Sequence, residues 1–341
     1  MINFESDYIQ GAHPRILEKL IETNFEPLSG YGFDNYTESA RRKIKCLCGK
    51  DDAEVFLLTG GTQTNQIVID TMLSQYEGVI CADTGHINTH EAGAVEFTGH
   101  KVITLNNYFG KIISKELEEY LNSYYSDENY EHTVIPGMVY ISHPTEYGTL
   151  YSKDELNNIS DICKKYNIPL YLDGARLGYG LMSNGTDITL KDVVQMCDVF
   201  YIGGTKVGAL CGEAVVFTHN NSPKHFFTSI KQHGALLAKG RLTGVQFDVL
   251  FTDNLYFDIS RHAIDMADKL REILKNKGYE FYIETVTNQI FIVLENYKYE
   301  ELKSKVKMGY WETLSDGKIV VRLATSWATN QEDILSLEKI L

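Results

Sequence analysis

One lysine of the chain stands in surroundings that are unusual for a charged side chain. Lys206 follows an apolar run at residues 199–202 and comes directly after Gly203, Gly204 and Thr205. An amine held in an apolar pocket loses the solvation of its charged form, so its pKa falls and it can act as a nucleophile or form a Schiff base. Because most lysines lie on the surface, this stretch alone favours an ordinary loop lysine.

A glycine-containing turn offers a place for a phosphate group. The stretch Thr59-Gly-Gly-Thr-Gln-Thr-Asn65 lies between a predicted strand and a predicted helix. Free backbone N–H groups and the helix dipole at such a helix start can receive a phosphate. The stretch has neither a Walker lysine nor a G-x-G-x-x-G pattern, which favours one phosphate over a nucleotide pyrophosphate. Taken alone, a plain strand-to-helix turn fits it about equally well.

An aspartate at the end of a short apolar strand provides the third element. Asp173 ends the run Tyr171-Leu-Asp173, and Arg176 follows three residues later. A protonated pyridine nitrogen would give this carboxylate a cationic partner, although an ion pair between the two side chains is an equally ordinary interpretation. A phosphate cradle, an aspartate for a ring nitrogen and a lysine for an aldehyde together match the three handles of pyridoxal phosphate.

Alternating strands and helices are predicted to position these residues. Apolar runs rich in Val, Ile and Leu predict strands at 54–58, 78–82, 101–105, 134–142, 169–173, 197–202 and 212–217. Between them, helices are predicted from about 62 to 75 and at 88–96, 114–124 and 153–166, the last with Ser152 and Glu155 at capping-box spacing. This α/β pattern predicts a mostly parallel sheet with helices on both faces and a ligand at the carboxyl ends of its strands.

The chain is expected to divide into three parts. Residues 1–35 form an N-terminal arm with a helix at 14–22, and residues 36–240 form the large cofactor-binding domain, which opens with a helix at 37–48. Residues 241–341 comprise a linking helix at 241–277, whole or broken, and a small α+β domain. Its predicted strands are 281–284, 290–294 and 319–323, and its predicted helices are 299–307 and 331–340.

Composition excludes several classes of protein. The net charge of -14, from 46 acidic and 32 basic residues, argues against a nucleic-acid partner. The N-terminus has neither a basic leader nor an apolar core, and no run approaches about 18 apolar residues, so a cytoplasmic protein without a membrane partner is expected. Six cysteines are too sparse for a disulfide framework, and Cys46-Leu-Cys48 has the wrong spacing for zinc, so no metal site is expected.

Over nearly its whole length, the chain resembles the threonine aldolase and β-eliminating lyase family of pyridoxal-phosphate enzymes, within the aspartate aminotransferase (fold type I) superfamily. The match in type and order covers Thr59–Asn65, Leu172–Arg176 and Lys206, and Ser6-Asp7 is similar to the family's N-terminal signature. The resemblance implies fold type I with a smaller C-terminal domain. It also implies a homodimer or homotetramer with shared active sites that cleaves a β-hydroxy-α-amino acid to glycine and an aldehyde.

The resemblance also assigns the cofactor contacts. Lys206 would hold the aldehyde and Asp173 the ring nitrogen of pyridoxal phosphate, with Gly61, Thr62 and Thr205 around its phosphate. Additional positive charge for the phosphate would come from Lys231, Lys239 or Arg241.

A second set of side chains is implied around the ring and the substrate. His86 would stack on the ring, with His90 as the competing candidate. Arg322 would grip the substrate α-carboxylate, helped by Ser6 and Arg176. The neighbouring subunit would contribute Tyr31.

The chain departs from the family at one position. Many threonine aldolases carry a histidine in the loop after the strand that corresponds to residues 134–142, and Glu146 takes that place here. A carboxylate can serve as a base if the pocket raises its pKa. His143 is the other candidate for the base, although Pro144 restricts it.

The reaction therefore has alternatives. They are β-elimination, transamination or racemisation of an amino acid, or a catalytically degenerate binding protein. The presence together of Asp173, Arg176, Lys206 and Arg322 argues against the degenerate protein.

Overall fold

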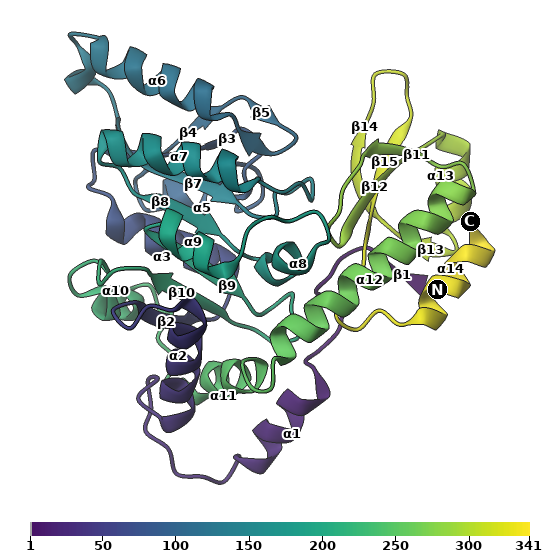
Figure 1. Ribbon diagram of the computed structural model, residues 1–341, viewed down its shortest axis with the longest axis horizontal. Helices are drawn as coiled ribbons and strands as arrows, with labels where there is room; N and C mark the ends of the chain where they lie inside the picture. The colour runs from purple at the N-terminus through teal and green to yellow at the C-terminus, as the bar shows by residue number, and fades with distance from the viewer. Residues whose placement is uncertain (1) are drawn as a thin grey trace.

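The computed structural model describes residues 2–341. Its main feature is a seven-stranded sheet (Figure 1). In sheet order the strands are β2 (Glu54–Leu58), β10 (Glu213–Phe217), β9 (Val199–Gly203), β8 (Leu170–Asp173), β7 (Ile135–Ser142), β3 (Glu77–Ala82) and β4 (Lys101–Leu105). Only β10 runs antiparallel to its neighbours, which confirms the predicted mostly parallel sheet.

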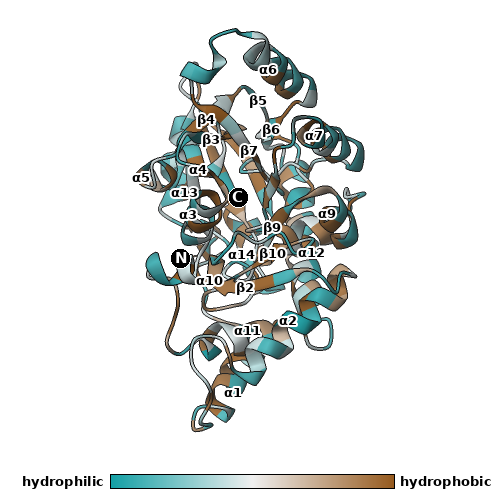
Figure 2. Ribbon diagram, turned by 90° about the vertical axis from the view of Figure 1, so that its left-hand side faces the viewer, coloured by the Kyte–Doolittle hydropathy of each residue, from teal (hydrophilic) through white to brown (hydrophobic). Residues whose placement is uncertain are grey.

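Helices cover both faces of this sheet, as Figure 2 shows for α3 and α5 on one side and α7 and α9 on the other. One face carries α2 (Asn35–Cys48), α6 (Ser114–Ser126), α7 (Lys153–Tyr166), α8 (Leu177–Met182), α9 (Leu190–Met196) and α11 (Arg241–Leu250). The other carries α3 (Gly61–Met72), α4 (His86–Thr89), α5 (Ala94–Phe97) and α10 (Phe226–Gln232). Successive residues of β3 pack into the apolar cores on opposite faces of the sheet. Val79 and Cys81 pack on the side of α3, and Ile80 and Ala82 pack on the side of α7.

Four small elements, α1 (Pro14–Glu22), β5 (Asn107–Tyr108), β6 (Lys111–Ile112) and η1 (Tyr130–His132), lie outside the seven-stranded sheet in the first two-thirds of the chain. Helix α1 precedes α2, and β5 pairs with β6 in a hairpin. The single 3-10 turn η1 precedes β7.

The smaller C-terminal part is reached through α12 (Leu255–Asn276). Its antiparallel sheet has the order β11 (Glu280–Ile283), β12 (Gln289–Leu294), β15 (Ile319–Ala324), β14 (Gly309–Thr313), and it is accompanied by α13 (Asn296–Lys303) and α14 (Gln331–Ile340). Strand β1 (Ile2–Asn3) pairs with β13 (Val306–Lys307), and the buried Phe4 belongs to the same apolar core. Both ends of the chain therefore lie on this part (Figure 1).

Several predicted elements need correction. The helix predicted at 88–96 is two short helices, α4 and α5, because Ala92 and Gly93 have positive φ between them. The linking helix at 241–277, expected to be whole or broken, is broken between α11 and α12, where Asp253 and Asn254 are left-handed. The helix predicted at 299–307 ends at Lys303 and is followed by β13.

Other predictions hold or were incomplete. The helices at 14–22 and 153–166, including the capping box of Ser152 and Glu155, are confirmed. Strand β14 and helices α8, α9 and α10 were not predicted. The three-part division at residues 35 and 240 stays a prediction.

Candidate active site

A cavity of about 250 Å³ opens at the carboxyl ends of β8 and β9. It brings together eight of the residues singled out in the sequence: Gly61, Thr62, His86, Glu146, Asp173, Arg176, Thr205 and Lys206. Burial lowers the pKa of Lys206, and the neighbouring Arg176 guanidinium lowers it further. The neutral, nucleophilic form of the amine is thereby favoured.

Asp173 is prepared to stay ionised although it is buried. It accepts four hydrogen bonds of 2.5–3.0 Å, from Asn65, Tyr140, Ala175 and Tyr201. Burial alone would raise the pKa of Asp173, but nearby His86 and these donors outweigh burial and lower it. A fixed anion of this kind suits a protonated ring nitrogen.

His86 lines the cavity beside Asp173, whereas His90 lines only an adjoining cavity that His86 and Lys206 also reach. Its Nδ1 lies 2.7 Å from Oε1 of the buried Glu91, and Asn65 donates to that same oxygen at 2.7 Å. Since Asn65 also donates to Asp173, one buried network fixes both the imidazole and the aspartate. Neither Asn65 nor Glu91 was identified in the sequence as a site residue, because their role depends on contacts across the fold.

The start of α3 is free to bind an anion. Gly60 precedes the helix and caps it with no side chain, so the amide groups of Gly61 and Thr62 are left for a ligand. Thr59 and Thr205 line the cavity beside them.

Glu213 is a buried carboxyl group in the same cavity that the sequence analysis missed. It accepts hydrogen bonds from the Thr205 hydroxyl at 2.7 Å and from the Gly204 amide at 3.2 Å. Burial raises the pKa of Glu213 to about 8. As the first residue of an apolar strand, it gave no sequence signal beyond an ordinary strand end.

Glu146 lines the same cavity and has one carboxyl oxygen without a partner in the described residues. Its Oε1 accepts from the Ser142 hydroxyl at 2.6 Å and from the His86 amide at 3.0 Å. Its Oε2 is buried with no hydrogen-bond partner among residues 2–341. Burial raises the pKa of Glu146, as a base requires.

His143, the alternative base, lies elsewhere. Its ring packs near Tyr151, with 6.3 Å between the ring centroids, and it is absent from the linings of both cavities described here. Burial lowers the pKa of His143 to about 4. The geometry therefore favours Glu146.

An adjoining cavity of about 360 Å³ contains Arg322. Its guanidinium donates to Gln289 Oε1 and to the Glu5 carbonyl, each at 3.0 Å. Its Nε is buried and has no partner in the described part of the chain. The rings of Trp311 and His90 also line this cavity.

Arg176 and Ser6 were predicted to help Arg322. Arg176 lines both cavities, but it is engaged by the buried Asp7, with Nε to Oδ2 at 2.6 Å and Nη2 to Oδ1 at 3.0 Å. Burial alone would raise the pKa of Asp7, yet Arg176 holds it well below its usual range. Ser6 is buried outside both linings, so its substrate contact stays a prediction.

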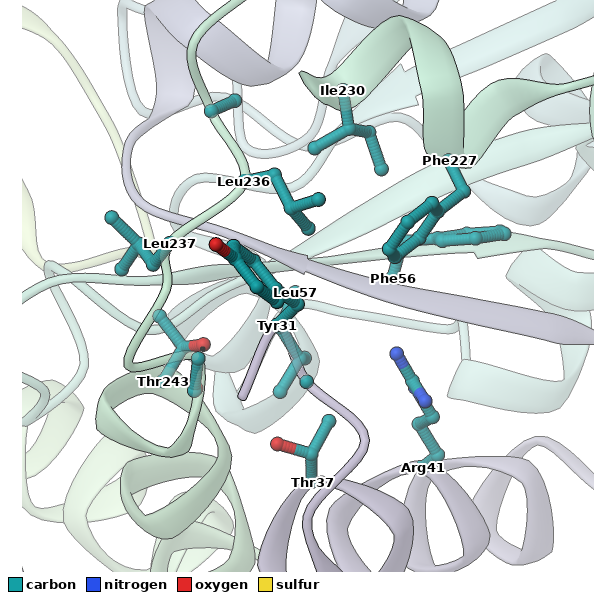
Figure 3. A pocket seen from close by; sticks show the side chains of 13 residues that line it. Tyr31, Thr37, Arg41, Phe56, Leu57, Phe227, Ile230, Leu236, Leu237 and Thr243 are labelled. Atoms are coloured by element: carbon teal, nitrogen blue, oxygen red, sulfur yellow. Dashed lines mark hydrogen bonds between the residues drawn. The ribbon is translucent and has the colours of Figure 1, made fainter. Parts of the chain in front are cut away.

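Tyr31 lies apart from Lys206 within its own chain. It lines a separate narrow pocket with Phe56, Phe227 and Leu236 (Figure 3). Lys231 Nζ lies 4.8 Å from the centre of the Tyr31 ring.

The three cations predicted for the phosphate are not among the residues that line the Lys206 cavity. Arg241 instead donates to the carbonyls of Thr23 and Glu26. A contribution from Lys231 or Lys239, or from Tyr31, would have to come from another copy of the chain, and it stays a prediction.

The fold and this cavity define an α/β protein with an aminotransferase-like fold and a half-buried lysine at the carboxyl ends of its strands. The chain belongs to the β-eliminating lyase family, whose sequence model matches residues 3–297, and this is the pyridoxal-phosphate-dependent family that the motifs resemble.

Three comparisons illustrate the relationship. Low specificity L-threonine aldolase from Pseudomonas sp. (strain NCIMB 10558) is 29% identical over 340 residues, covering 98% of this chain and 95% of the relative. A solved threonine aldolase from Leishmania major has a TM-score of 0.95 at 42% identity and covers 100% of this chain and 98% of its own. Histidinol-phosphate aminotransferase from Clostridium acetobutylicum, at 14% identity and a TM-score of 0.76, covers 100% of this chain and 98% of its own and shares the fold.

Two other kinds of feature are absent from residues 2–341. Over residues 2–341, no helix is both long and apolar enough to cross a membrane. In the same described range, no three His, Cys, Asp or Glu side chains are grouped to hold a metal ion.

Proposed function

We propose that the protein is a pyridoxal-phosphate-dependent lyase that cleaves a β-hydroxy-α-amino acid of the threonine or allo-threonine type to glycine and an aldehyde. The observation that carries the proposal is the meeting of three features in one cavity. They are the Lys206 amine, the ionised Asp173 and the carboxyl group of the buried Glu146. The threonine aldolases among the relatives support the same reaction.

The residues present fit the cofactor. Lys206 would bond its aldehyde, Asp173 would keep a proton on the ring nitrogen, and the free amides of Gly61 and Thr62 would hold its phosphate. His86, fixed by Glu91, would orient the ring. When bound, pyridoxal phosphate supplies an electron sink that stabilises negative charge at the α-carbon of the amino acid.

The chain's own residues then handle the substrate. Arg322, which lines the adjoining cavity, binds the α-carboxylate through its guanidinium group. Glu146 removes the β-hydroxyl proton, and the bond between the α- and β-carbons breaks as the aldehyde carbonyl forms. The electron pair stays on the α-carbon, which takes up a proton to give glycine. A carboxylate with a raised pKa is suited to this proton transfer near neutral pH.

The first test is to replace the lysine. We expect the variant Lys206→Ala to lose the visible absorbance of the bound cofactor and to lose aldehyde release from threonine. Lys50→Ala, at a position outside the Lys206 cavity, is the matched control and keeps both. A Lys206→Ala protein with full activity and unchanged absorbance would show the proposal to be wrong.

A second test separates the alternative reactions. The purified protein is given threonine, allo-threonine and phenylserine stereoisomers, and the products are identified. We expect aldehyde and glycine in equal amounts. Pyruvate-type keto acid with ammonia would indicate β-elimination, and amino transfer to a keto acid would indicate transamination. The homo-oligomeric assembly and the cytoplasmic location remain predictions that accompany this proposal.

A further inference from the structure

One face of strand β12 docks onto the loop that carries Glu146. Every second residue along the strand and its approach, which share one face, contacts this loop. The contacts are Thr287 Oγ1 donating to the Gly148 carbonyl at 2.8 Å, Gln289 Nε2 donating to the Glu146 carbonyl at 3.4 Å, and the Phe291 and Tyr147 rings 6.1 Å apart. Three side chains of the small C-terminal part therefore hold the loop that carries the candidate base.

Gln289, which makes the second of these contacts, also contacts Arg322, the candidate carboxylate-binding arginine. Gln289 is fully buried, and its Oε1 accepts a hydrogen bond from Arg322 Nη1 at 3.0 Å. Strands β12 and β15 are paired, with Phe291 opposite Arg322, so the two residues belong to one sheet. The amide of one side chain therefore joins Arg322 to the backbone of Glu146.

We propose that Gln289 is a positioning residue that sets the separation between the α-carboxylate site at Arg322 and the base Glu146, and thereby determines which β-diastereomer is cleaved. The inference rests on the proposed function. It means that the small C-terminal part helps the enzyme to distinguish the two configurations at the β-carbon of the substrate.

The geometry of the substrate explains why this separation matters. With the carboxylate fixed at Arg322, threonine and allo-threonine place the β-hydroxyl on different sides of the β-carbon. A base must come within about 2.6–3.2 Å of the proton that it removes. A displacement of about 1 Å can cost about 10²-fold in rate. A shift of the Glu146 loop relative to Arg322 therefore changes the two rates by different factors.

Two variants separate the two ends of the link. Gln289→Glu keeps an acceptor for Arg322 and removes the donor to the Glu146 carbonyl. Gln289→Met has a similar volume and removes both hydrogen bonds. Thr287→Val is the matched control, because it loses a hydrogen bond from the same strand face to the same loop without touching Arg322.

The ratio of kcat/KM for threonine to that for allo-threonine is the decisive measurement. We expect this ratio to change by about fivefold or more in both Gln289 variants, the lower end of typical coupling between two sites. Gln289→Glu should act mainly on kcat, and Gln289→Met on kcat and KM together. Thr287→Val loosens the loop at Gly148 but keeps the Gln289 link between Arg322 and Glu146, so it should change the ratio less than either Gln289 variant. If both diastereomers slow by one common factor, Gln289 is only structural and the proposal is overturned.

Hydrogen–deuterium exchange gives a readout that needs no turnover. The peptide covering residues 143–150 should exchange faster in both Gln289 variants than in the wild type. Unchanged exchange would refute the link even if the protein proves to catalyse a different reaction. Faster exchange in a protein that releases no aldehyde would instead contradict the proposed function and leave the positioning of the loop intact.

Discussion

At the scale of single residues, Glu146 carries the clearest prediction. The variant Glu146→Gln should lower kcat by about 10²–10⁴-fold, the usual contribution of a general base. Because burial raises the pKa of Glu146, the wild-type rate should fall on acidification through that raised pKa, above the value of about 4.3 for an exposed glutamate.

A profile of kcat against pH checks this prediction. The acidic limb should disappear in Glu146→Gln. His143→Gln, at the alternative base, should keep it, because His143 lines neither cavity. The reverse pattern would make His143 the base.

The buried ion pair of Asp7 and Arg176 should make the main contribution of the N-terminal segment to the pH dependence of the unfolding free energy in acid. Asp7→Asn leaves the Arg176 guanidinium buried without its carboxylate, and this loss costs about 3–5 kcal/mol of unfolding free energy. The pKa of Asp7 is depressed, so its stabilisation is complete above the unfolded-state pKa of about 3.9 and is lost as the pH falls below that value.

Urea unfolding from pH 7 down to pH 3 measures this contribution. The difference between wild type and Asp7→Asn should be constant above about pH 5 and shrink below about pH 4. The exposed Glu5→Gln is the control and should show no such difference. A pH-independent difference would contradict an ionised Asp7.

Residue type and spacing allowed Lys206, Asp173 and the Gly61 turn to be identified in the sequence, because each follows a strand and carries its chemistry in its own side chain. Asp7 and Gln289 could not be identified in this way. Asp7 acts on an arginine 169 positions away, and Gln289 acts on one 33 positions away. Only the fold makes these residues neighbours.

At the scale of elements, the close approach of β8 and β9 depends on a glycine. A Cβ on Gly174 would lie 1.9 Å from the Tyr201 carbonyl oxygen, so Gly174→Ala must push the two strands apart next to Asp173. We expect a loss of about 1–3 kcal/mol or more in stability, together with weaker binding of pyridoxal phosphate.

Thermal unfolding and cofactor titration test this expectation. Gly11→Ala is the control, because a Cβ there would meet only Leu210 Cδ2, at 4.0 Å, and Gly11 lines neither cavity. Equal effects of the two substitutions would argue against a special packing role for Gly174.

The alternation of elements was predictable, whereas their interruptions were not. Apolar periodicity continues across residues 241–277, but Asp253 and Asn254 take left-handed backbone conformations that end one helix and begin another. Short aspartate and asparagine side chains tolerate this conformation, yet nothing in the periodicity requires it. The same holds for Ala92 between α4 and α5.

At the scale of the whole molecule, the order of the strands in the sheet could not be predicted from the sequence. The parallel sheet follows from its apolar strands, but the insertion of β10 between β2 and β9 brings residues 54–58 beside 213–217. The pairing of β1 with β13 likewise depends on a contact between the two ends of the chain. The candidate active site depends on this contact between the two ends of the chain, because Arg322 donates a hydrogen bond to the carbonyl of Glu5.

The last prediction concerns assembly. Leu17, Ile21 and Phe25, on α1 and just after it, are 42%, 76% and 94% exposed. Three exposed apolar side chains at four-residue spacing favour an interaction site here, and the proposed homo-oligomer supplies a second copy as the occupant. The mass in solution should therefore be a multiple of 38.7 kDa.

Phe25→Asp should shift the mass toward that of the monomer, whereas Tyr297→Asp, at an exposed aromatic on the small domain, should not. Light scattering after gel filtration decides, and a wild-type mass of 38.7 kDa would exclude a shared active site and leave Tyr31 without the role predicted for it.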